Sequence, residues 1–169
     1  MTTIHPSYIY GPVGPGQVYN GPAHGTNRYI YGLIGGEPGR PVSGYDHGVA
    51  PPLHVDVRDV ARAHVLALKV PASADEPKRF ILSSSRFTWK EAIELIAQAR
   101  PELKGRLPVI SGKEPALGPY AVLDTSATER ILGIKDYVKW QQTVLDTIDD
   151  LVRVEKDPDL GNRSLLPVR

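Results

Sequence analysis

The sequence predicts an α/β domain with a few short strands and about five helices, formed as a single unit by residues 1–156. Two kinds of segment predict it: β-branched and aromatic stretches that end at glycine or proline, and amphipathic stretches preceded by helix-capping residues. The chain of 169 residues is 41% hydrophobic, which is enough for one buried core. Residues 157–169 are expected to form a polar tail.

Three stretches have the residue pattern of β-strands. Thr3–Tyr10 is β-branched and aromatic and runs directly into Gly11, which predicts a strand that ends in a turn. Pro6 removes one ladder donor, so this strand is expected at a sheet edge or with a bulge. Leu53–Val57 is expected to be a short strand or an extended entry into a helix, and Arg79–Ser83 a buried strand.

Five stretches have the capping residues or the apolar stripe of helices. Asp56 is expected to accept from free amides of a first helical turn, where Asp59 adds negative charge at the positive end of the dipole. Thr88 and Glu91 have the spacing of a capping box, and Pro101 ends that helix. The expected helices cover residues 26–34, 57–68, 88–100, 126–132 and 140–155.

Several single positions in these helices carry further expectations. Thr26 is expected to cap the first helix, and Ser126 with Glu129 to form a second capping box. His64 falls on the apolar face of the second helix, where a hydrogen-bonded core histidine is expected. Asp150 falls outside the apolar stripe of the last helix and is expected to face water.

Composition excludes several classes of function. With 20 basic and 19 acidic residues the net charge is +1, which provides no broad basic surface, so no nucleic-acid partner is expected. The absence of cysteine excludes disulfides and thiolate zinc sites. The five histidines lack metal-ligand spacing, so no metal site is expected. No leader-like or long apolar segment is present, and a cytoplasmic protein with no membrane partner is expected.

The glycine- and proline-rich segment from Gly11 to Gly25 is predicted to be a functional loop. It has little periodicity, and compact domains keep such long connections mainly for binding. A second irregular connection is expected from Glu37 to Pro52.

Three ordered motifs resemble parts of the extended short-chain dehydrogenase/reductases. Ile4-His5-Pro6-Ser7-Tyr8-Ile9-Tyr10-Gly11-Pro12 resembles the strand and turn that follow their catalytic helix. The stretch His54–His64 is similar to the segment that re-enters the core after the substrate loop in the dihydroflavonol reductase and cinnamoyl-CoA reductase branch. Asp124–Gly133 resembles the C-terminal subdomain of that branch. The resemblance implies the C-terminal, substrate-binding portion of an extended Rossmann-type reductase, with the N-terminal nucleotide-binding half absent.

The same resemblance implies site residues. Those matching Pro6, Ser7 and Tyr8 line the nicotinamide side of NAD(P) in the family, and the loop from Val13 to Arg28 supplies much of the substrate wall. The implied substrate-binding residues, for a small hydrophobic carbonyl-type metabolite, are Val13, Gln17, His24, Asn27, Arg28 and His54.

Two family features are missing from the sequence. The phosphate grip is a glycine-rich turn between a strand and a helix, whereas prolines separate Gly11, Gly14 and Gly16 and no helix follows them directly. None of the eight tyrosines has a lysine four positions later, so the family's proton-transferring pair is also absent. The expected function is therefore the substrate-binding half of an NAD(P)-dependent carbonyl reductase that is not competent alone for hydride transfer.

Two alternatives remain open. One is a cofactor-independent isomerase, cyclase or dehydratase that acts on a hydrophobic metabolite with His24 or His54 as acid or base. The other is a non-catalytic binding protein. The expected edge strand Thr3–Tyr10 would leave unpaired backbone groups, so a homo-oligomer or a separate nucleotide-binding half is the expected partner.

Overall fold

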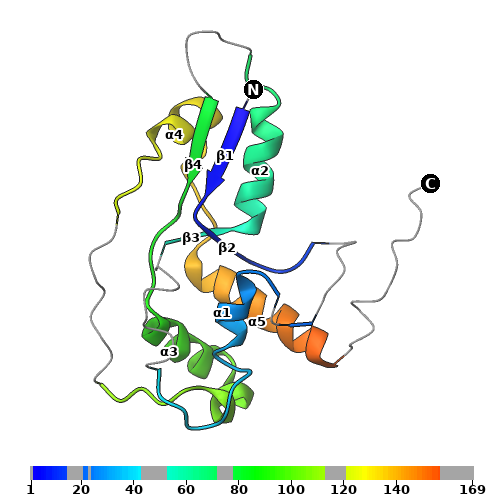
Figure 1. Ribbon diagram of the computed structural model, residues 1–169, viewed down its shortest axis with the longest axis vertical. Coiled ribbons are helices and arrows are strands. Elements are labelled where there is room, and N and C mark those ends of the chain that lie inside the picture. Colours follow the sequence, from blue (N-terminus) through cyan, green and yellow to red (C-terminus); the bar gives the residue numbers. More distant parts are fainter. Residues whose placement is uncertain are drawn as a thin grey trace, which may run out of the picture.

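A computed structural model describes residues 2–14, 21–22, 24–42, 53–71, 78–112 and 121–156. It confirms the α/β class. The described residues form four short strands, five α-helices and one 3-10 helix (Figure 1). They are β1 (Thr2–Pro6), β2 (Tyr8–Tyr10), α1 (Asn27–Tyr31), β3 (His54–Asp56), α2 (Val57–Ala67), β4 (Lys78–Leu82), α3 (Trp89–Ala99), η2 (Pro101–Arg106), α4 (Ser126–Leu132) and α5 (Trp140–Lys156).

The single strand expected over Thr3–Tyr10 is wrong, because the chain divides there into two strands with different partners. β1 pairs in parallel with β4, and β2 pairs in parallel with β3. The break falls at Ser7, whose backbone N–H still donates to the Leu82 carbonyl at 2.9 Å. Beyond Ser7 the chain leaves β4 and takes β3 as its neighbour, so one continuous ladder cannot form.

Pro6 occupies an edge position, as the sequence predicts. Alternate residues of a strand direct their backbone groups to opposite edges, and the Ser7 N–H points toward β4. The Pro6 nitrogen therefore belongs to the outer edge of β1, where the missing N–H costs no ladder hydrogen bond. Among the described residues, no strand pairs with that outer edge.

Two packed regions lie on either side of the β2–β3 pair. In the upper part of Figure 1, α2 lies beside β1 and α4 beside β4. The core between them is aliphatic apart from Phe80, and its buried members are Val55, Val60, Ala63, Phe80, Leu82, Leu132 and Ile134. In the lower part, α1, α3, η2 and α5 enclose a more aromatic core that includes Tyr10, Phe87 and Trp89.

The buried face of α2 differs from the expected one. Val60 and Ala63 are buried, whereas His64 is exposed and Leu68 is 87% exposed. The expectation of a core histidine at position 64 is therefore wrong. Its Nδ1 instead lies 2.8 Å from the Val60 carbonyl oxygen, one turn back along the helix. Compared with the orientation expected from the sequence, α2 is rotated about its axis, so that Val60 and Ala63 pack onto the sheet and His64 does not.

Two of the expected helix caps are present. Asp56 accepts from the Arg58 amide at 2.8 Å, and Thr88 exchanges hydrogen bonds with Glu91 in a full capping box. The box expected at Ser126 is wrong, because Ser126 is already helical and its amide donates to Asp124 at 2.9 Å. The preceding N-cap residue makes no side-chain capping bond.

The first helix is shorter than expected, and Thr26 does not cap it. Helix α1 is followed by tight turns, although Leu33 and Ile34 are buried as expected. Thr26 has helical backbone angles, and its hydroxyl donates to the Ile9 carbonyl instead of a helical amide. A contact distant in sequence therefore replaces the expected local cap.

Two further findings concern the remaining segments. In the described part of the chain, no helix combines the length and apolar character needed to cross a bilayer. The polar tail at 157–169 and most of the second irregular connection, at 43–52, lie outside the described residues.

Candidate functional site

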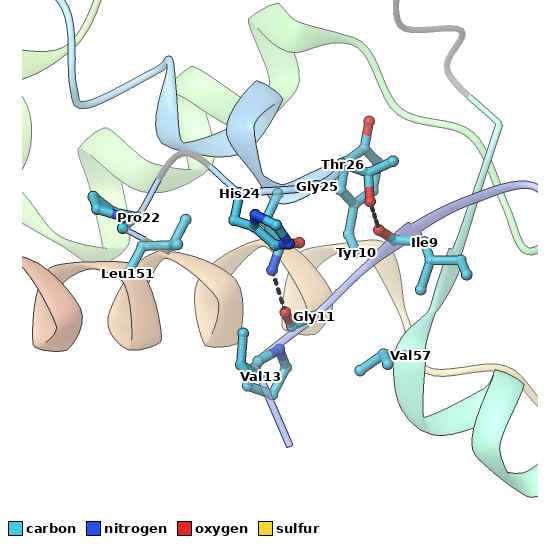
Figure 2. Close-up of a pocket in the computed structure, with 13 residues that line it drawn as sticks. Ile9, Tyr10, Gly11, Val13, Pro22, His24, Gly25, Thr26, Val57 and Leu151 are labelled. Atoms are coloured by element: carbon cyan, nitrogen blue, oxygen red, sulfur yellow. Dashed lines mark hydrogen bonds between the residues drawn. The ribbon is translucent and has the colours of Figure 1, made fainter. Parts of the chain in front are cut away.

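A pocket of about 360 Å³ opens at the carboxyl ends of the parallel strands β2 and β3 (Figure 2). Open α/β sheets bind their ligands at this end of their strands. The pocket lies between the segment after β2, the N-terminal ends of α1 and α2, and the side of α5. Its lining residues are Ile9, Tyr10, Gly11, Pro12, Val13, Gly21, Pro22, His24, Gly25, Thr26, Asn27, Val57 and Leu151.

Side chains from α1 and α5 hold one wall of this pocket, residues 9–13, which we call the pocket wall. The Thr26 hydroxyl donates to the Ile9 carbonyl, and the Asn27 amide donates to the Gly11 carbonyl at 2.7 Å. Further along, the Val13 N–H donates to the Asp150 carboxylate at 2.9 Å. These contacts satisfy one backbone group of β2, at Ile9, and two of the segment that follows it, at Gly11 and Val13.

Asp150 is therefore buried, and the expectation that it faces water is wrong. Its residue is 8% exposed, and its carboxylate also pairs with Arg153 at 2.6 Å. In the helical repeat Asp150 lies next to the apolar stripe. The Val13 N–H faces that side of α5 and needs a hydrogen-bond acceptor there, which an apolar side chain would not provide. A carboxylate fits the position because it receives both an N–H and a cation.

Gly11 is required at the turn where the pocket wall leaves β2. Its φ is +140°, a backbone conformation that side-chain-bearing residues rarely adopt. A Cβ at this position would lie 2.6 Å from the Val57 Cγ1 atom. The close approach of Gly11 to Val57 joins the ends of β2 and β3 at the base of the pocket.

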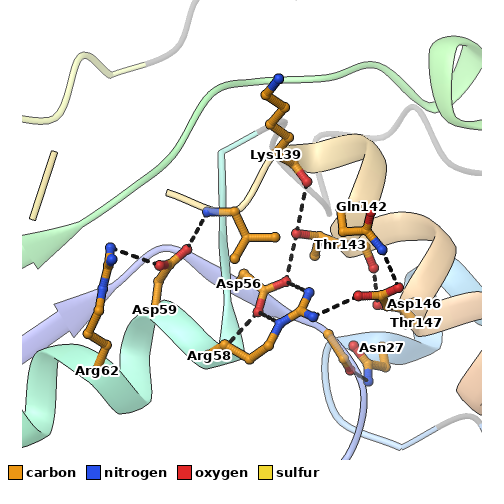
Figure 3. Close-up of polar contacts among 12 residues, drawn as sticks. Asn27, Asp56, Arg58, Asp59, Arg62, Lys139, Gln142, Thr143, Asp146 and Thr147 are labelled. Atoms are coloured by element: carbon orange, nitrogen blue, oxygen red, sulfur yellow. Dashed lines mark hydrogen bonds and ion pairs between the residues drawn. The ribbon is translucent and has the colours of Figure 1, made fainter. Parts of the chain in front are cut away.

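An ion-pair network around the buried Asp56 carboxylate fixes the start of α2 against α5 (Figure 3). Arg58 pairs with Asp56 at 2.8 Å and with Asp146 at 2.7 Å, and the Thr143 hydroxyl donates to Asp56 at 2.7 Å. Burial favours the neutral form of Asp56, but the hydrogen bonds from Arg58 and Thr143 outweigh it and hold the Asp56 pKa below its ordinary value. Asp56 is therefore a charged, fully paired anchor beside Val57 of the pocket.

A second carboxylate ties α2 to the segment before α5. Asp59 accepts from the Val138 N–H at 2.8 Å and pairs with Arg62 at 3.0 Å. Burial nevertheless raises its pKa above the ordinary value, because these partners do not fully offset the loss of solvent. Neither Asp56 nor Asp59 lines the pocket.

The structure brings together three of the substrate-binding residues that the sequence resemblance implies. Val13, His24 and Asn27 all line the pocket, with His24 exposed. Gln17 lies outside the described residues. Arg28 is exposed and does not line the pocket, and its guanidinium lies 4.9 Å from the ring centre of Tyr29.

His54 lies in the core instead of the pocket lining. It is completely buried on β3, with its ring centre 5.2 Å from that of Phe87. The Ser85 backbone favours the charged ring, although neither ring nitrogen has a hydrogen bond of ordinary geometry among the described residues. Burial outweighs this and lowers the His54 pKa to about 4, so the ring is neutral near pH 7.

The three residues implied for the nicotinamide side lie together at the break between β1 and β2. Pro6 ends β1, Ser7 forms the break, and Tyr8 begins β2 opposite His54. The Ser7 hydroxyl is buried and has no hydrogen-bond partner among the described residues. None of the three lines the pocket.

Sequence reasoning missed several residues of the site. Leu151 belongs to the buried apolar side of α5, and an apolar stripe gives no sign that one of its members reaches a pocket. Val57 follows a strand directly, and that position at the carboxyl end of a parallel strand is the signal that could have found it. No local signal identifies Asp150, because Val13 lies 137 positions away.

The described residues do not form a grip for the pyrophosphate of a dinucleotide. Such a grip needs a short glycine-rich turn that leads from a strand straight into a helix. Here β2 ends at Tyr10 and α1 begins at Asn27, with only five residues in the helix. The described residues also contain no group of three histidine or carboxylate side chains placed to hold a metal ion.

Comparison with known proteins finds relatives along nearly the whole chain. NADPH-dependent methylglyoxal reductase GRE2 of Saccharomyces cerevisiae is 26% identical over 159 residues, which is 92% of this chain and 44% of the relative. Cinnamoyl-CoA reductase 1 of Arabidopsis thaliana is 32% identical over 98 residues, which is 58% of this chain and 27% of the relative. The chain thus spans less than half the length of the curated relatives it matches.

A solved structure shows the same fold. The crystal structure of yeast methylglyoxal/isovaleraldehyde reductase Gre2 complexed with NADPH superposes with a TM-score of 0.66 at 27% identity. The match covers 92% of this chain and 44% of that one. No protein-family model matches the chain.

Proposed function

Because this chain is homologous to the C-terminal half of reductases of the extended short-chain dehydrogenase/reductase superfamily, we propose that it is the substrate-binding half of an NAD(P)H-dependent carbonyl reductase. One observation carries the proposal: a pocket at the carboxyl ends of two parallel strands, lined by the segment after β2. Three of the residues implied by resemblance, Val13, His24 and Asn27, line that pocket.

The chain's own residues bind and orient the carbonyl compound. The apolar side chains of Val13, Val57 and Leu151 exclude water from its carbon skeleton. Thr26, Asn27 and Asp150 keep the pocket wall in place. NAD(P)H, when held by a nucleotide-binding half, supplies the hydride. The break at Pro6, Ser7 and Tyr8 is the part of this chain proposed to face the nicotinamide. The buried Ser7 hydroxyl, which has no partner within the described part of the chain, supports a polar contact there.

A nucleotide-binding half is the partner we propose for the outer edge of β1. The backbone groups of Ile4 and Pro6 point to that edge, and no described strand pairs with it. An unpaired parallel strand favours the addition of another strand. A second copy of this chain is the competing occupant, and size-exclusion chromatography with light scattering distinguishes a self-paired dimer from a monomer that awaits another half.

Reconstitution tests the proposed function. The part of yeast GRE2 that this chain does not match is fused in front of Met1, and oxidation of NADPH is followed with methylglyoxal and with isovaleraldehyde. We expect turnover by the fusion and none by either part alone. Turnover by this chain alone would overturn the proposal. Binding of a carbonyl compound to the pocket of the unfused chain, followed by NMR, gives a second result if the fusion does not fold.

A second candidate function is favoured by the position of His24. This exposed imidazole lines the pocket, where a histidine can act as acid or base without a nicotinamide. The chain would then isomerise or dehydrate a hydrophobic metabolite. Loss of nicotinamide-independent turnover in His24→Ala, with binding retained, would select this function over the reductase half.

A further inference from the structure

The side of α2 that faces away from the sheet carries an apolar stripe, formed by Ala61, Val65 and Leu68. These residues lie four and three positions apart, so they share one side of the helix. All three are exposed, Val65 to 57% and Leu68 to 87%. The opposite side of α2 packs onto the sheet through Val60 and Ala63. The helix is thus apolar on two sides, whereas a surface helix normally turns a polar side to water.

This outer stripe is separate from the surfaces already described. Two of the four large hydrophobic residues that are exposed in the described structure lie on it, one turn apart. Isolated exposed apolar residues are common, but neighbouring ones mark a surface for a partner. A strand added to β1 would extend the sheet in its own plane and would not by itself cover a helix face that points away from the sheet.

The charges beside the outer stripe differ between the two ends of α2. At the start, Arg58 is paired with two carboxylates, those of Asp56 and Asp146, and one cation with two anions leaves a net charge of −1. Near the end, the described residue beside Leu68 is the exposed Lys69. Two copies of this helix in antiparallel orientation therefore bring opposite charges together, whereas a parallel pair would bring like charges together.

We propose that the outer stripe docks on the outer stripe of a second copy of this chain, with the two α2 helices antiparallel. Ala61 of one copy then lies opposite the partner's Leu68, so that a small side chain makes room for a large one. Val65 lies near the two-fold axis, and Lys69 lies toward the acidic start of the partner's helix. Three side chains cover much less than the roughly 800 Å² per partner of a stable interface, so the dissociation constant is about 0.1 mM.

Sedimentation velocity of the whole chain, between about 0.01 and 1 mM, tests the docking. We expect a reversible dimer whose fraction rises over this range. Leu68→Glu should weaken association at least about tenfold, because the dimer would bury an unpaired carboxylate. Val122→Glu is the matched control, because Val122 is equally exposed and lies outside α2, and it should associate like the wild type.

Two outcomes of sedimentation would overturn the docking. A wild-type chain that stays monomeric throughout would show that a second copy does not occupy the outer stripe, and would leave a helix of the nucleotide-binding half as the competing occupant. Equal association of the wild type and Leu68→Glu would place the dimer contact elsewhere, such as the outer edge of β1. The reductase proposal does not depend on either result, because it concerns the pocket.

Disulfide cross-linking tests the antiparallel orientation. The chain contains no cysteine, so one introduced thiol reports on one position. Val65→Cys should form a cross-linked dimer under oxidation. Ala61→Cys should not, because seven residues separate the two copies of position 61 by about 10 Å along the helices. Cross-linking of both variants would contradict the antiparallel orientation, and cross-linking of neither would contradict docking through α2.

Discussion

The start of α2 and the pocket wall are both held by buried carboxylates, but the two regions are organised differently. At the start of α2, Asp56 accepts from the amide and side chain of Arg58, two positions away. At the pocket wall, Val13 reaches Asp150 across 137 positions. At the start of α2 the neighbouring Arg58 makes most of the contacts of Asp56, and Thr143 of α5 adds one more. All the contacts reported for the pocket wall come from side chains that are at least 16 positions away. The candidate site therefore lies on the region whose geometry depends on contacts distant in sequence.

Of the substitutions that test this difference between the two regions, removal of the Asp56 side chain should cause the largest loss of stability. In Asp56→Ala the Arg58 guanidinium and the Thr143 hydroxyl lose their shared partner inside the protein. We expect a loss of about 3–4 kcal/mol in the free energy of unfolding, measured by urea denaturation, because the helix loses its N-cap and Thr143 loses a charged acceptor. Asp56→Asn keeps an acceptor and should lose less. A change below about 1 kcal/mol in the alanine variant would mean that this network does not anchor α2.

Acid should destabilise the region beside that anchor through His54. Its folded-state pKa of about 4 lies below the ordinary 6.5, so the unfolded chain binds the proton first as the pH falls. The stabilisation by the neutral ring is complete above about pH 6.5 and is lost toward pH 4, by up to about 3 kcal/mol. His54→Phe should flatten the stability profile between those pH values. Parallel profiles for the wild type and the variant would contradict this.

A methyl group at Gly11 should strain the pocket wall. Gly11→Ala combines a φ of +140° with a contact of 2.6 Å to the Val57 side chain, and we expect a loss of about 2 kcal/mol in unfolding free energy. Val57→Ala in the same chain should recover the part of the loss that is due to the clash, as a double-mutant cycle would measure. Strictly additive losses would show that Val57 does not confine this turn.

The smallest effect is expected at Asp150. Asp150→Ala should cost about 1 kcal/mol and speed hydrogen exchange at the Val13 amide, because that N–H loses its acceptor. Asp150→Asn retains an acceptor and should restore part of the protection. Asp149→Ala is the control, because Asp149 pairs with Arg100 and makes no contact with the wall in the described structure. Equal Val13 exchange rates in all three variants would contradict the role of Asp150.

Sequence patterns predicted helix ends that depend on neighbouring residues. They did not predict side-chain positions that depend on residues distant in the sequence. The Asp56 cap, the capping box at Thr88 and the long last helix follow from neighbouring residues, and the structure confirms them. Thr26 carries an equally good capping signal, but its hydroxyl is taken by Ile9. The side of α2 that faces the sheet could not be read either, because the apolar stripe is wide enough for two orientations.

The residues of the candidate site were predicted only in part, because their positions also depend on contacts that are distant in the sequence. Resemblance to a family placed Val13, His24 and Asn27 near a substrate, and all three line the pocket. His54 carries the same implication but is enclosed by the aromatic core. Its position in sequence, at the start of a strand, does not tell which side of the β2–β3 pair its ring will occupy. Whether any of these residues contacts a substrate stays a prediction.

Calorimetric titration with NADPH tests the central claim most directly, since this chain is proposed to supply the substrate pocket while another segment holds the dinucleotide. The titration compares the purified chain with its fusion to the unmatched part of GRE2. We predict micromolar affinity for the fusion and no measurable binding to the chain alone. Micromolar binding of NADPH by the chain alone would contradict the division between substrate pocket and nucleotide grip on which the account depends.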